Sequence, residues 1–422
     1  MTAGALTIST VLWIVGRIGM DEPRFSPWLG PGMLLSIWAI TLMAVTLLAT
    51  ARSRMIEPMF GGLDRAVRLH RRLGPAAITL VVLHVLMYLP PMLADGMSLG
   101  DILVPFWSPQ ALTFDSSVLW ALLIWTGFAY VRGLPYEGWL SLHGLLGPIF
   151  LGAGAHSLFV GSTLAAFEPL RFWMWFLLFV GTAAWAYRVL LYRWAAPRYR
   201  YRVEAVDRRS HDTIDLVMRP QDRRMIYEPG TFVFVRRPGG KAEYHPFSIS
   251  SSPAERNLRV SVRLVGDFTR ALANAQTGEP VEVFGPFGSF TPHRYAHHRR
   301  LICIGAGIGI TPFLGMLRFE MTNDDFRRIW LWYIVRDGDN APYDAEIRDL
   351  VLRADSWVDY ELWMTAQRGR PTAADIMAAA APFDDFGIML CGRPEFVGDL
   401  VRQFLAAGVP RERLIWEDFH FH

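Results

Sequence analysis

Four histidines in the first half of the chain have the type and spacing that could hold metal cofactors. They form two sequence pairs, His70 with His84 and His143 with His156, whose members lie 14 and 13 positions apart. Along an α-helix, either spacing corresponds to a rise of about 20 Å. If the two helices run parallel, His70 shares one depth with His143, and His84 shares another with His156. Two opposed imidazoles at two depths would hold two stacked six-coordinate haems.

Other interpretations of these histidines are weaker. Zinc is disfavoured because two histidines per site, with no carboxylate or cysteine partner, make a poor ligand set. A packed or interfacial histidine is the ordinary interpretation of any one taken alone, but ionisable groups at membrane depth are costly. On an ideal helix His156 would point about 140° away from His143, which an ideal helix does not reconcile with a shared site. Glycines and a proline between them could allow a kink or local overwinding. The intervening stretch contains Gly144, Gly147, Pro148, Gly152 and Gly154.

The first half of the chain has six apolar segments, each close to the roughly 20 residues that cross a bilayer core, and the histidines lie in or beside two of them. The segments are about 5–20, 29–51, 73–93, 116–131, 140–162 and 170–191. Only 21 of the 81 charged residues precede position 197. Residues 1–196 are therefore predicted to form a six-helix membrane domain. The first segment lacks a basic stretch before it, so a cleaved signal peptide is the poorer interpretation.

The charges of the loops predict the orientation in the membrane. Six arginines lie between the second and third segments, whereas the loops on the opposite side carry mostly Asp and Glu. By the positive-inside rule, both termini are cytoplasmic. The chain has a single lysine, Lys241, against 41 arginines, which we interpret as the composition of a bacterial genome. We therefore expect an integral protein of a bacterial inner membrane.

Composition also excludes several classes of protein. The net charge of +3 is too small to favour a nucleic-acid binder. The two cysteines exclude a disulfide scaffold and a four-cysteine zinc site. With 52% hydrophobic and 19% charged residues, the chain is neither disordered nor an ordinary soluble enzyme.

Beyond about residue 198 the pattern changes to short alternating strands, which predict a small antiparallel β-barrel over 197–297. The expected strands include 201–206, 213–218, 231–235 and 258–264, and the barrel is expected to end near 284–288.

A glycine-rich turn follows the apolar strand 301–304 and precedes the helical stretch 313–320. Glycines at such a turn let the backbone approach a pyrophosphate, and the helix N-terminus supplies partial positive charge. Residues 298–422 are therefore predicted to form an α/β nucleotide-binding domain, with further strands at 329–335, 360–364 and 387–390. Arg336 could clamp the 2′-phosphate of NADPH or could be a solvated strand end. Arg370 is a second candidate for the clamp.

The chain resembles the NADPH oxidase and ferric reductase superfamily over nearly its whole length. The motifs 245–248, 265–269, 285–288, 305–312 and 391–395 follow the family's order, and the two histidine spacings match its membrane domain. The resemblance implies a membrane α-helical bundle with two haems. It also implies a fused ferredoxin-reductase-like module, made of an antiparallel β-barrel FAD domain and an α/β Rossmann-like NADPH domain.

The resemblance further implies a route from NADPH through FAD and two b-type haems to an outer acceptor. It places FAD beside His245, Pro246, Phe247, Ser248, Arg263, Phe268 and Thr269. It places NADPH beside Gly305, Gly307, Gly309, Thr311, Pro312, Arg336, Arg370, Cys391 and Gly392. A C-terminal aromatic ring should stack on the flavin, with Phe419 as the first choice and Phe421 as the second. Phe419 and Cys391 are the expected catalytic residues, and Phe150 is expected between the haems.

The acceptor is less constrained. Oxygen, giving superoxide, is the preferred expectation. A ferric chelate or other metal, and a periplasmic protein partner or quinone, are the alternatives. Tyr88 lies one turn beyond His84, where animal oxidases have a second histidine, and this difference leaves the outer chemistry open. No EF-hand motif or obligatory protein partner is evident, so constitutive activity is expected.

Overall fold

The computed structural model describes residues 1–18, 27–53, 55–110, 112–131, 136–160, 167–192, 198–237, 244–295, 298, 300–322, 327–354, 356–380 and 385–417. Their contacts separate two units, Met1–Ala196 and Pro197–His422.

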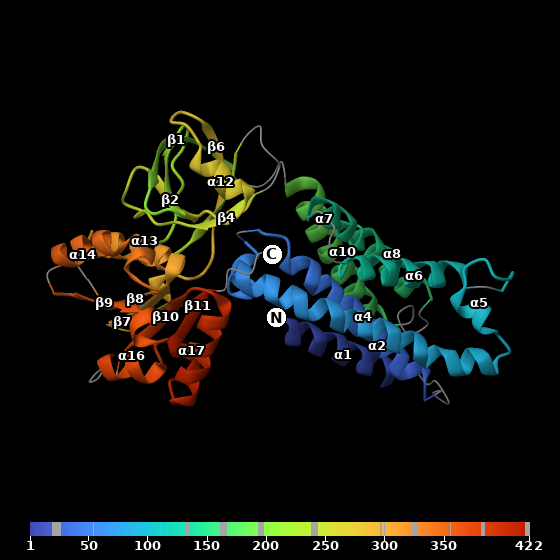
Figure 1. The fold of residues 1–422 in the computed structure, drawn as a ribbon. Coiled ribbons are helices and arrows are strands. Elements are labelled where there is room, and N and C mark those ends of the chain that lie inside the picture. Colours follow the sequence, from blue (N-terminus) through green and yellow to red (C-terminus); the bar gives the residue numbers. More distant parts are fainter. Residues whose placement is uncertain are drawn as a thin grey trace. The chain divides into compact units, whose positions relative to one another are not determined.

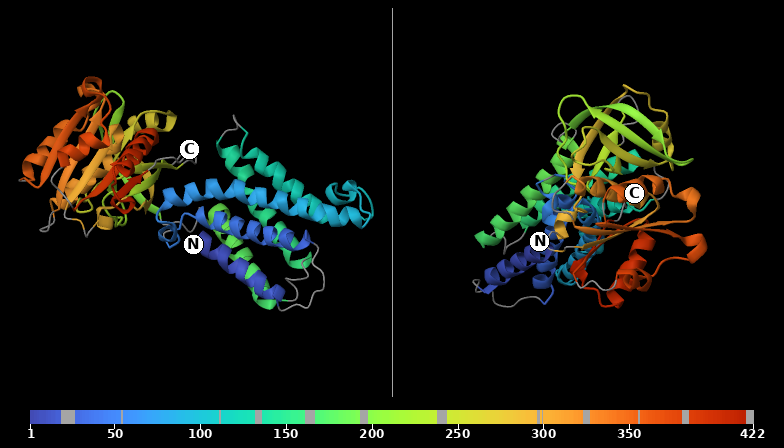
Figure 2. Two further views of the ribbon diagram at one scale, coloured as in Figure 1. Left: turned by 90° about the horizontal axis from the view of Figure 1, so that it is seen from below. Right: turned by 90° about the vertical axis from the view of Figure 1, so that its left-hand side faces the viewer.

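The first unit is a bundle of apolar helices that lie alongside one another (Figures 1 and 2). Its helices are α1 (Thr2–Ile18), α2 (Leu29–Ala49), α3 (Glu57–Phe60), α4 (Leu63–Ala94), α5 (Leu99–Leu103), α6 (Thr113–Phe128), α7 (Tyr136–Gly144), α8 (Leu146–Val160) and α10 (Glu168–Ala186). A π-helical turn, η1 (Tyr187–Leu191), continues α10. Helix α2 is central, since it packs against α1, α4, α8 and α10. A helix that is apolar all round suits this buried position.

Helical segments occupy all six positions at which the sequence predicts membrane spans. Among the described helices, three are long and apolar enough to cross a membrane: Leu29–Ala49, Arg65–Ala94 and Glu168–Leu191. Helices α1, α6 and the broken pair α7 and α8 are shorter. Helix α4 begins ten residues before the predicted segment. The prediction followed apolar residues only, whereas arginine is a good helix former and the arginine-rich stretch continues the helix. This early start places His70 on the same helix as His84.

The fifth predicted helix is broken at Leu145, between the two histidines that it was expected to carry. Pro148 has no N–H to donate to the carbonyl of Gly144, and the indole Nε1 of Trp185 donates to that carbonyl instead, at 2.7 Å. The Leu145 N–H donates to Leu142 O at 3.1 Å, a tighter turn than the α-helical pattern. The break therefore supplies the irregularity that the 13-residue spacing requires.

The second unit begins with a curled antiparallel sheet, in the order β4-β3-β6-β1-β2-β5. Its strands are β1 (Arg198–Arg208), β2 (Thr213–Pro220), β3 (Phe232–Arg236), β4 (His245–Ser248), β5 (Leu258–Arg263) and β6 (Pro280–Phe287), with helix α12 (Asp267–Ala273) between β5 and β6. Burial alternates along β1, so that Tyr199, Tyr201 and Val203 face the core. A bridge between Ile249 and Val260 links the two edges of the sheet. The predicted strands all lie within these elements or within one residue of them.

A five-stranded parallel sheet follows, in the order β11-β10-β7-β8-β9. Its elements are β7 (Arg300–Ala306), η3 (Gly307–Ile310), α13 (Thr311–Glu320), β8 (Arg328–Val335), α14 (Asp344–Arg353), β9 (Val358–Met364), α15 (Thr365–Arg368), α16 (Ala373–Ala380), β10 (Gly387–Cys391), α17 (Pro394–Ala406) and β11 (Leu414–Glu417). Helices α13 and α14 cover one face, and α16 and α17 cover the other (Figure 1). This is the doubly wound arrangement predicted for the C-terminal part.

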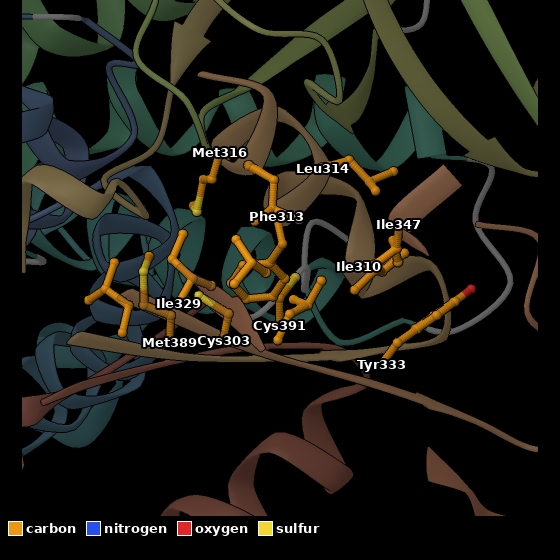
Figure 3. Close-up of a cluster of buried hydrophobic side chains, with 14 of the residues drawn as sticks. Cys303, Ile310, Phe313, Leu314, Met316, Ile329, Tyr333, Ile347, Met389 and Cys391 are labelled. Atoms are coloured by element: carbon orange, nitrogen blue, oxygen red, sulfur yellow. The ribbon is translucent and has the colours of Figure 1, made fainter. Parts of the chain in front are cut away.

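The core between the sheet and α13 is densely apolar. Figure 3 shows Phe313 and Met316 of α13 beside Cys303 of β7 and Met389 and Cys391 of β10, all buried. This packing fixes the start of α13 above the carboxyl ends of β7 and β10.

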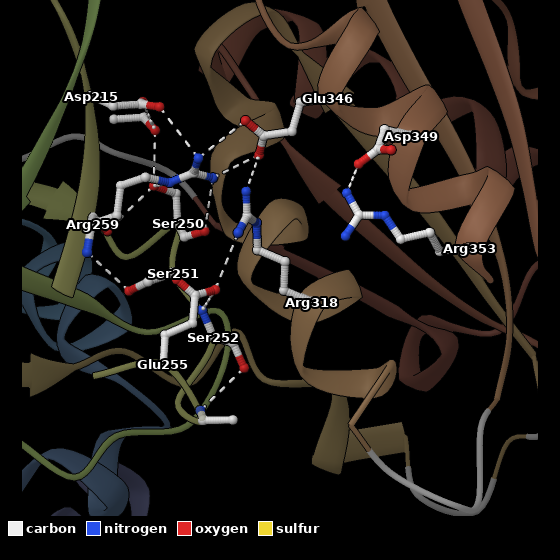
Figure 4. A network of polar contacts seen from close by, with 12 residues as sticks. Asp215, Ser250, Ser251, Ser252, Glu255, Arg259, Arg318, Glu346, Asp349 and Arg353 are labelled. Carbon is white, nitrogen blue, oxygen red and sulfur yellow. Dashed lines mark hydrogen bonds and ion pairs between the residues drawn. The ribbon is translucent and has the colours of Figure 1, made fainter. Parts of the chain in front are cut away.

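A buried ionic network joins the two sheets of the second unit (Figure 4). Arg259 of β5 donates to both carboxylate oxygens of Glu346 on α14, at 3.1 and 2.8 Å. It also lies 3.3 Å from the fully buried carboxylate of Asp215 on β2. Arg318 of α13 donates to Glu346 at 2.9 Å, and Tyr343 donates to Asp215 at 2.9 Å. The network therefore ties the antiparallel sheet to two helices of the parallel one.

Candidate functional site

The four histidines come together as the two expected pairs. The ring centroids of His70 on α4 and His143 on α7 lie 5.7 Å apart, and those of His84 on α4 and His156 on α8 lie 6.4 Å apart. A metal about 2.0 Å from one nitrogen of each ring puts the centroids a little over 6 Å apart. Both pairs are therefore spaced as two imidazoles that would hold one haem iron between them. Among the described residues, no group of three or more His, Cys, Asp or Glu side chains could hold a metal ion.

Two of these rings are oriented by backbone carbonyls of α2. His70 Nδ1 lies 3.2 Å from Thr46 O, and His84 Nδ1 lies 2.8 Å from Gly32 O. When Nδ1–H donates to a carbonyl, Nε2 is left free for a metal. The carbonyl of Thr46 is available because the Thr50 N–H turns to Leu47 O at the end of α2.

Gly32 brings α2 close enough to α4 for its contact with His84. A Cβ at this position would lie 2.7 Å from the ring of Tyr88, which itself packs against His84 with centroids 4.8 Å apart. The sequence pattern identified the histidines but not these carbonyls, because a helix–helix contact leaves no local signal in either helix.

The other two histidines have different surroundings. His156 Nδ1 lies 2.7 Å from a carboxylate oxygen of Asp115 on α6. His143 stacks on Trp139, with centroids 4.9 Å apart and planes at 9°, and its buried Nδ1 has no hydrogen-bond partner among the described residues. Phe150, expected between the haems, is buried on α8 and lies against Gly181 of α10. Its role between the haems stays a prediction.

Three aromatic rings predicted to surround FAD form one stack. His245 on β4 lies 3.9 Å from Phe268 on α12, with planes at 19°. Phe247, two residues along β4 and so on the same face, lies 6.3 Å from Phe268 with planes at 16°. Pro246 and Ser248 alternate with them and pair with Phe234 and Phe232 of β3. Flat aromatic faces grouped in this way suit a planar ring system such as a flavin.

Arg263 and Thr269 already have structural partners beside this stack. The Thr269 hydroxyl accepts from the N–H groups of Val265 and Gly266, at 3.1 and 3.0 Å, and caps α12. Arg263 donates to Asp212 at 2.8 Å. Burial raises the pKa of Asp212, but hydrogen bonds from Ser210 and Arg263 outweigh it and lower the pKa overall. Arg263 ends β5 and Thr269 lies in the first turn of α12. Their contact with FAD stays a prediction.

The glycine-rich turn lies at the switch point of the parallel sheet, where the chain leaves β7 in one direction and β10 in the other. Ligands of such sheets bind outside the carboxyl ends of these two strands. Gly305 pairs with Cys391, and a Cβ on Gly309 would lie 2.4 Å from the Cys391 carbonyl. Gly307 adopts a left-handed φ of 57°. The close approach explains why glycines occupy the turn.

The remaining nucleotide candidates line the same edge of the sheet. Thr311 and Pro312 open α13 and are buried. Arg336 follows β8 with 82% of its side chain exposed, and its carbonyl accepts from the Ala366 N–H at 2.9 Å. Arg370 is exposed beyond α15. Two exposed guanidinium groups thus follow neighbouring strands, as a phosphate clamp requires, and their role stays a prediction.

The expected catalytic residues are the least constrained by the structure. Cys391 is fully buried in the core under α13. A Cβ added to the next residue, Gly392, would lie 2.9 Å from the Cβ of Ala306. Its part in hydride transfer stays a prediction. Phe419 and Phe421 lie outside the described residues.

Three protein-family models match successive parts of the chain. They are a ferric reductase like transmembrane component over residues 35–154, an FAD-binding domain over 198–289 and an oxidoreductase NAD-binding domain over 303–402. The histidine pairs fall in or beside the first match, the aromatic stack in the second and the glycine turn in the third.

Curated relatives match about half of the chain. The ferredoxin reductase component of 3-ketosteroid-9-alpha-monooxygenase from Rhodococcus rhodochrous is 29% identical over 227 residues, which are 52% of this chain and 64% of that protein. A superoxide-generating NADPH oxidase heavy chain from Dictyostelium discoideum is 26% identical over 220 residues, which are 48% of this chain and 40% of that protein. The chain thus spans between two fifths and two thirds of the length of these relatives.

One solved structure resembles the chain over nearly its full length. A flavohemoglobin from Malassezia yamatoensis, with bound FAD and haem, aligns over 98% of both chains with a TM-score of 0.52 and 16% identity. At this identity the likeness concerns the fold alone.

Proposed function

The chain belongs to the NADPH oxidase and ferric reductase superfamily, and we propose that it carries electrons from NADPH across a membrane to an acceptor on the far side. The observation that carries the proposal is the pairing of His70 with His143 and of His84 with His156, at centroid distances of 5.7 and 6.4 Å. These pairs occur in a chain that also matches FAD-binding and NAD-binding domains. Electron transfer from a nicotinamide to haem needs both parts.

On the soluble side, the glycine turn after β7 receives the pyrophosphate of NADPH, and Arg336 and Arg370 receive its 2′-phosphate. The flavin ring lies beside the aromatic stack of His245, Phe247 and Phe268. When bound, FAD accepts a hydride from NADPH and releases single electrons, which a haem can take. Cys391, buried at the carboxyl end of β10, is proposed to underlie the nicotinamide site. Phe419 is the proposed ring that must leave the flavin before the nicotinamide can stack.

In the membrane, six spans place the soluble unit and both termini in the cytoplasm, where NADPH is found. Helices at all six expected places and the arginine-rich stretch before and within α4 support this topology. His70 and His143 hold the inner of two b-type haems, and His84 and His156 hold the outer. The bias toward arginine supports a bacterial inner membrane as the location.

We propose oxygen as the acceptor, with superoxide as the product. A superoxide-generating NADPH oxidase heavy chain is among the relatives that the chain resembles, and this supports oxygen as the first candidate. A ferric chelate is the second candidate, because the model that matches residues 35–154 is that of a ferric reductase like component.

The test is an assay of the full-length chain in lipid nanodiscs. Pyridine haemochrome should give two haems per chain, and His84→Ala should reduce this to one while NADPH still reduces FAD under anaerobic conditions. Exposed His211 provides the control, since His211→Ala should keep both haems. Superoxide dismutase should suppress the NADPH-driven signal of a superoxide probe. Ferric-chelate reduction without oxygen, and no superoxide signal with it, would favour the second candidate. Two haems retained in His84→Ala would overturn the ligand assignment.

A further inference from the structure

The outer histidine pair has a carboxylate attached to one of its members. Asp115, in the first turn of α6, lies 2.7 Å from Nδ1 of His156. The partners of His70 and His84 are backbone carbonyls, and His143 has no Nδ1 partner in the part of the chain that the structure describes. Among the described residues, a carboxylate is therefore the Nδ1 partner of one of the four imidazoles and of none of the other three.

The position of Asp115 is not explained by the helix alone. An acidic residue in the first turn of a helix gains from the helix dipole, and this would be satisfied by a carboxylate pointing to solvent. The side chains of Asp115 and His156 are 28% and 27% exposed, so the pair is half withdrawn from water. Withdrawing a carboxylate into an apolar bundle is costly unless it meets a hydrogen-bond donor, and here the donor is a haem-ligand candidate.

We infer that Asp115 is a positioning residue that lowers the reduction potential of the outer haem by accepting the Nδ1–H of His156. The inference rests on the proposed function, in which His84 and His156 hold that haem. A carboxylate that accepts this hydrogen gives the imidazole partial imidazolate character and makes it a more electron-rich ligand. The ferric state carries one more positive charge than the ferrous state. The negative carboxylate and the more electron-rich imidazole therefore both stabilise the ferric state.

The consequence is directional. When the outer haem passes one electron to the acceptor, its iron goes from ferrous to ferric and the acceptor gains that electron, while the proton stays on His156 Nδ1. By favouring the ferric state, Asp115 increases the driving force of this last step. Among the described residues the inner pair has no carboxylate partner. The reducing power is therefore raised at the outer haem, which has to reduce the acceptor.

The experiment is a potentiometric titration of the full-length chain in nanodiscs, followed by haem absorbance. Asp115→Asn keeps an oxygen that can accept from Nδ1–H but removes the charge. We expect two haems per chain and a roughly tenfold higher ratio of ferrous to ferric outer haem at a fixed potential, which is about 59 mV for one electron. The inner haem should not change. Asp115→Glu should restore most of the shift, because the charge returns.

A matched control removes one carboxylate at the same end of the bundle. Asp95 is exposed and follows the last turn of α4, and Asp95→Asn should leave both potentials unchanged. Two retained haems with unchanged potentials in Asp115→Asn would overturn the inference and leave the proposed function standing. Absence of haem from the wild-type chain would instead overturn the proposed function.

A measurement on the wild type covers the case in which Asp115→Asn loses its haem. Imidazolate character narrows the spread of the g values of a low-spin ferric haem. The two wild-type haems should therefore give different electron paramagnetic resonance spectra, with the narrower spread belonging to the signal that His156→Ala abolishes. Identical spectra from the two haems would contradict the inference.

Discussion

Each paired histidine on α4 has its Nδ1 beside a backbone carbonyl of α2, and this contact orients its ring. At His84 that contact is the carbonyl of Gly32, and the absence of a side chain at residue 32 is what lets the helices approach. A ring that loses its Nδ1 partner can rotate or change tautomer, and either change removes Nε2 from the line of ligation. The site therefore requires a glycine at position 32 as well as the histidine ligand.

Gly32→Ala should therefore weaken the outer haem site. The new methyl carbon would lie 2.7 Å from the ring of Tyr88, and overpacking of this kind costs about 1–3 kcal/mol. We expect reduced content of the outer haem by pyridine haemochrome and a lower thermal midpoint. Gly74→Ala is the matched control on α4, because nothing lies within 4 Å of its added carbon. Equal haem content in both variants would contradict the role of Gly32.

The exposed guanidinium after β8 gives a second prediction at the scale of one residue. Arg336→Ala should raise the KM for NADPH far more than the KM for NADH, because only NADPH carries the 2′-phosphate. The loss should be about 1.5–3 kcal/mol, the usual worth of a hydrogen bond to a charged group. Arg402 is a control of similar exposure on α17. An equal effect on both nucleotides would make Arg336 a structural arginine.

Among the elements, the broken helix α7–α8 shows how a sequence pattern becomes geometry. Two histidines 13 positions apart cannot share a face of one straight helix, and the chain resolves this with Pro148 and a tight turn at Leu145. The orphaned carbonyl of Gly144 is satisfied by Trp185 of α10. A neighbouring helix therefore stabilises the break that sets the relative rotation of His143 and His156.

Trp185→Phe tests this arrangement. The substitution removes the indole N–H and leaves the Gly144 carbonyl without its 2.7 Å donor, at a cost of about 1–3 kcal/mol. Because the break lies directly after His143, we expect broadened absorption of the inner haem and a lowered thermal midpoint. Trp120, exposed on α6, also donates to a carbonyl, that of Leu103, and Trp120→Phe is the control. Unchanged inner-haem spectra in Trp185→Phe would show that the break needs no such support.

The positions of most elements could be predicted from the sequence, because apolar periodicity and turn residues are local properties. The histidine pairs were predicted too, since their spacing repeats on two helices. What the sequence could not predict were contacts between distant residues, such as Asp115 with His156 or Arg259 with Glu346. In the sequence, Asp115, Arg259 and Glu346 do not differ locally from ordinary surface charges. Only the tertiary fold brings them together.

At the scale of the whole molecule, the reductase unit contains two sheets that must keep a fixed relation if a nicotinamide is to reach a flavin. The buried network of Asp215, Arg259 and Glu346 is a polar link that serves this purpose. A buried ion pair is weak support for stability in itself, but removing one member is costly because a charge is left buried. The network therefore fixes orientation more than it adds stability.

This network makes the unit sensitive to acid within a defined range. Burial raises the pKa of Glu346, but hydrogen bonds and charge from Arg259 and Arg318 outweigh it and lower the pKa from 4.5 to about 2. The unfolded chain then binds a proton to Glu346 more readily than the folded chain does. The resulting stabilisation is present above about pH 4.5, falls as the pH drops and is lost by about pH 2.

Hydrogen–deuterium exchange of the full-length chain can follow this loss at β5 and α14. Between pH 6 and pH 3, after correction for the intrinsic rate, protection of these two elements should fall in the wild type. Glu346→Gln should begin with lower protection at pH 6, because Arg259 is left buried with less compensation, and should lose most of the dependence on pH. Glu412 is exposed, so Glu412→Gln should behave as the wild type does. If Glu346→Gln kept the wild-type dependence on pH, other carboxylates would be responsible for the acid sensitivity, and Glu346 would not couple protonation to the contact between the two sheets.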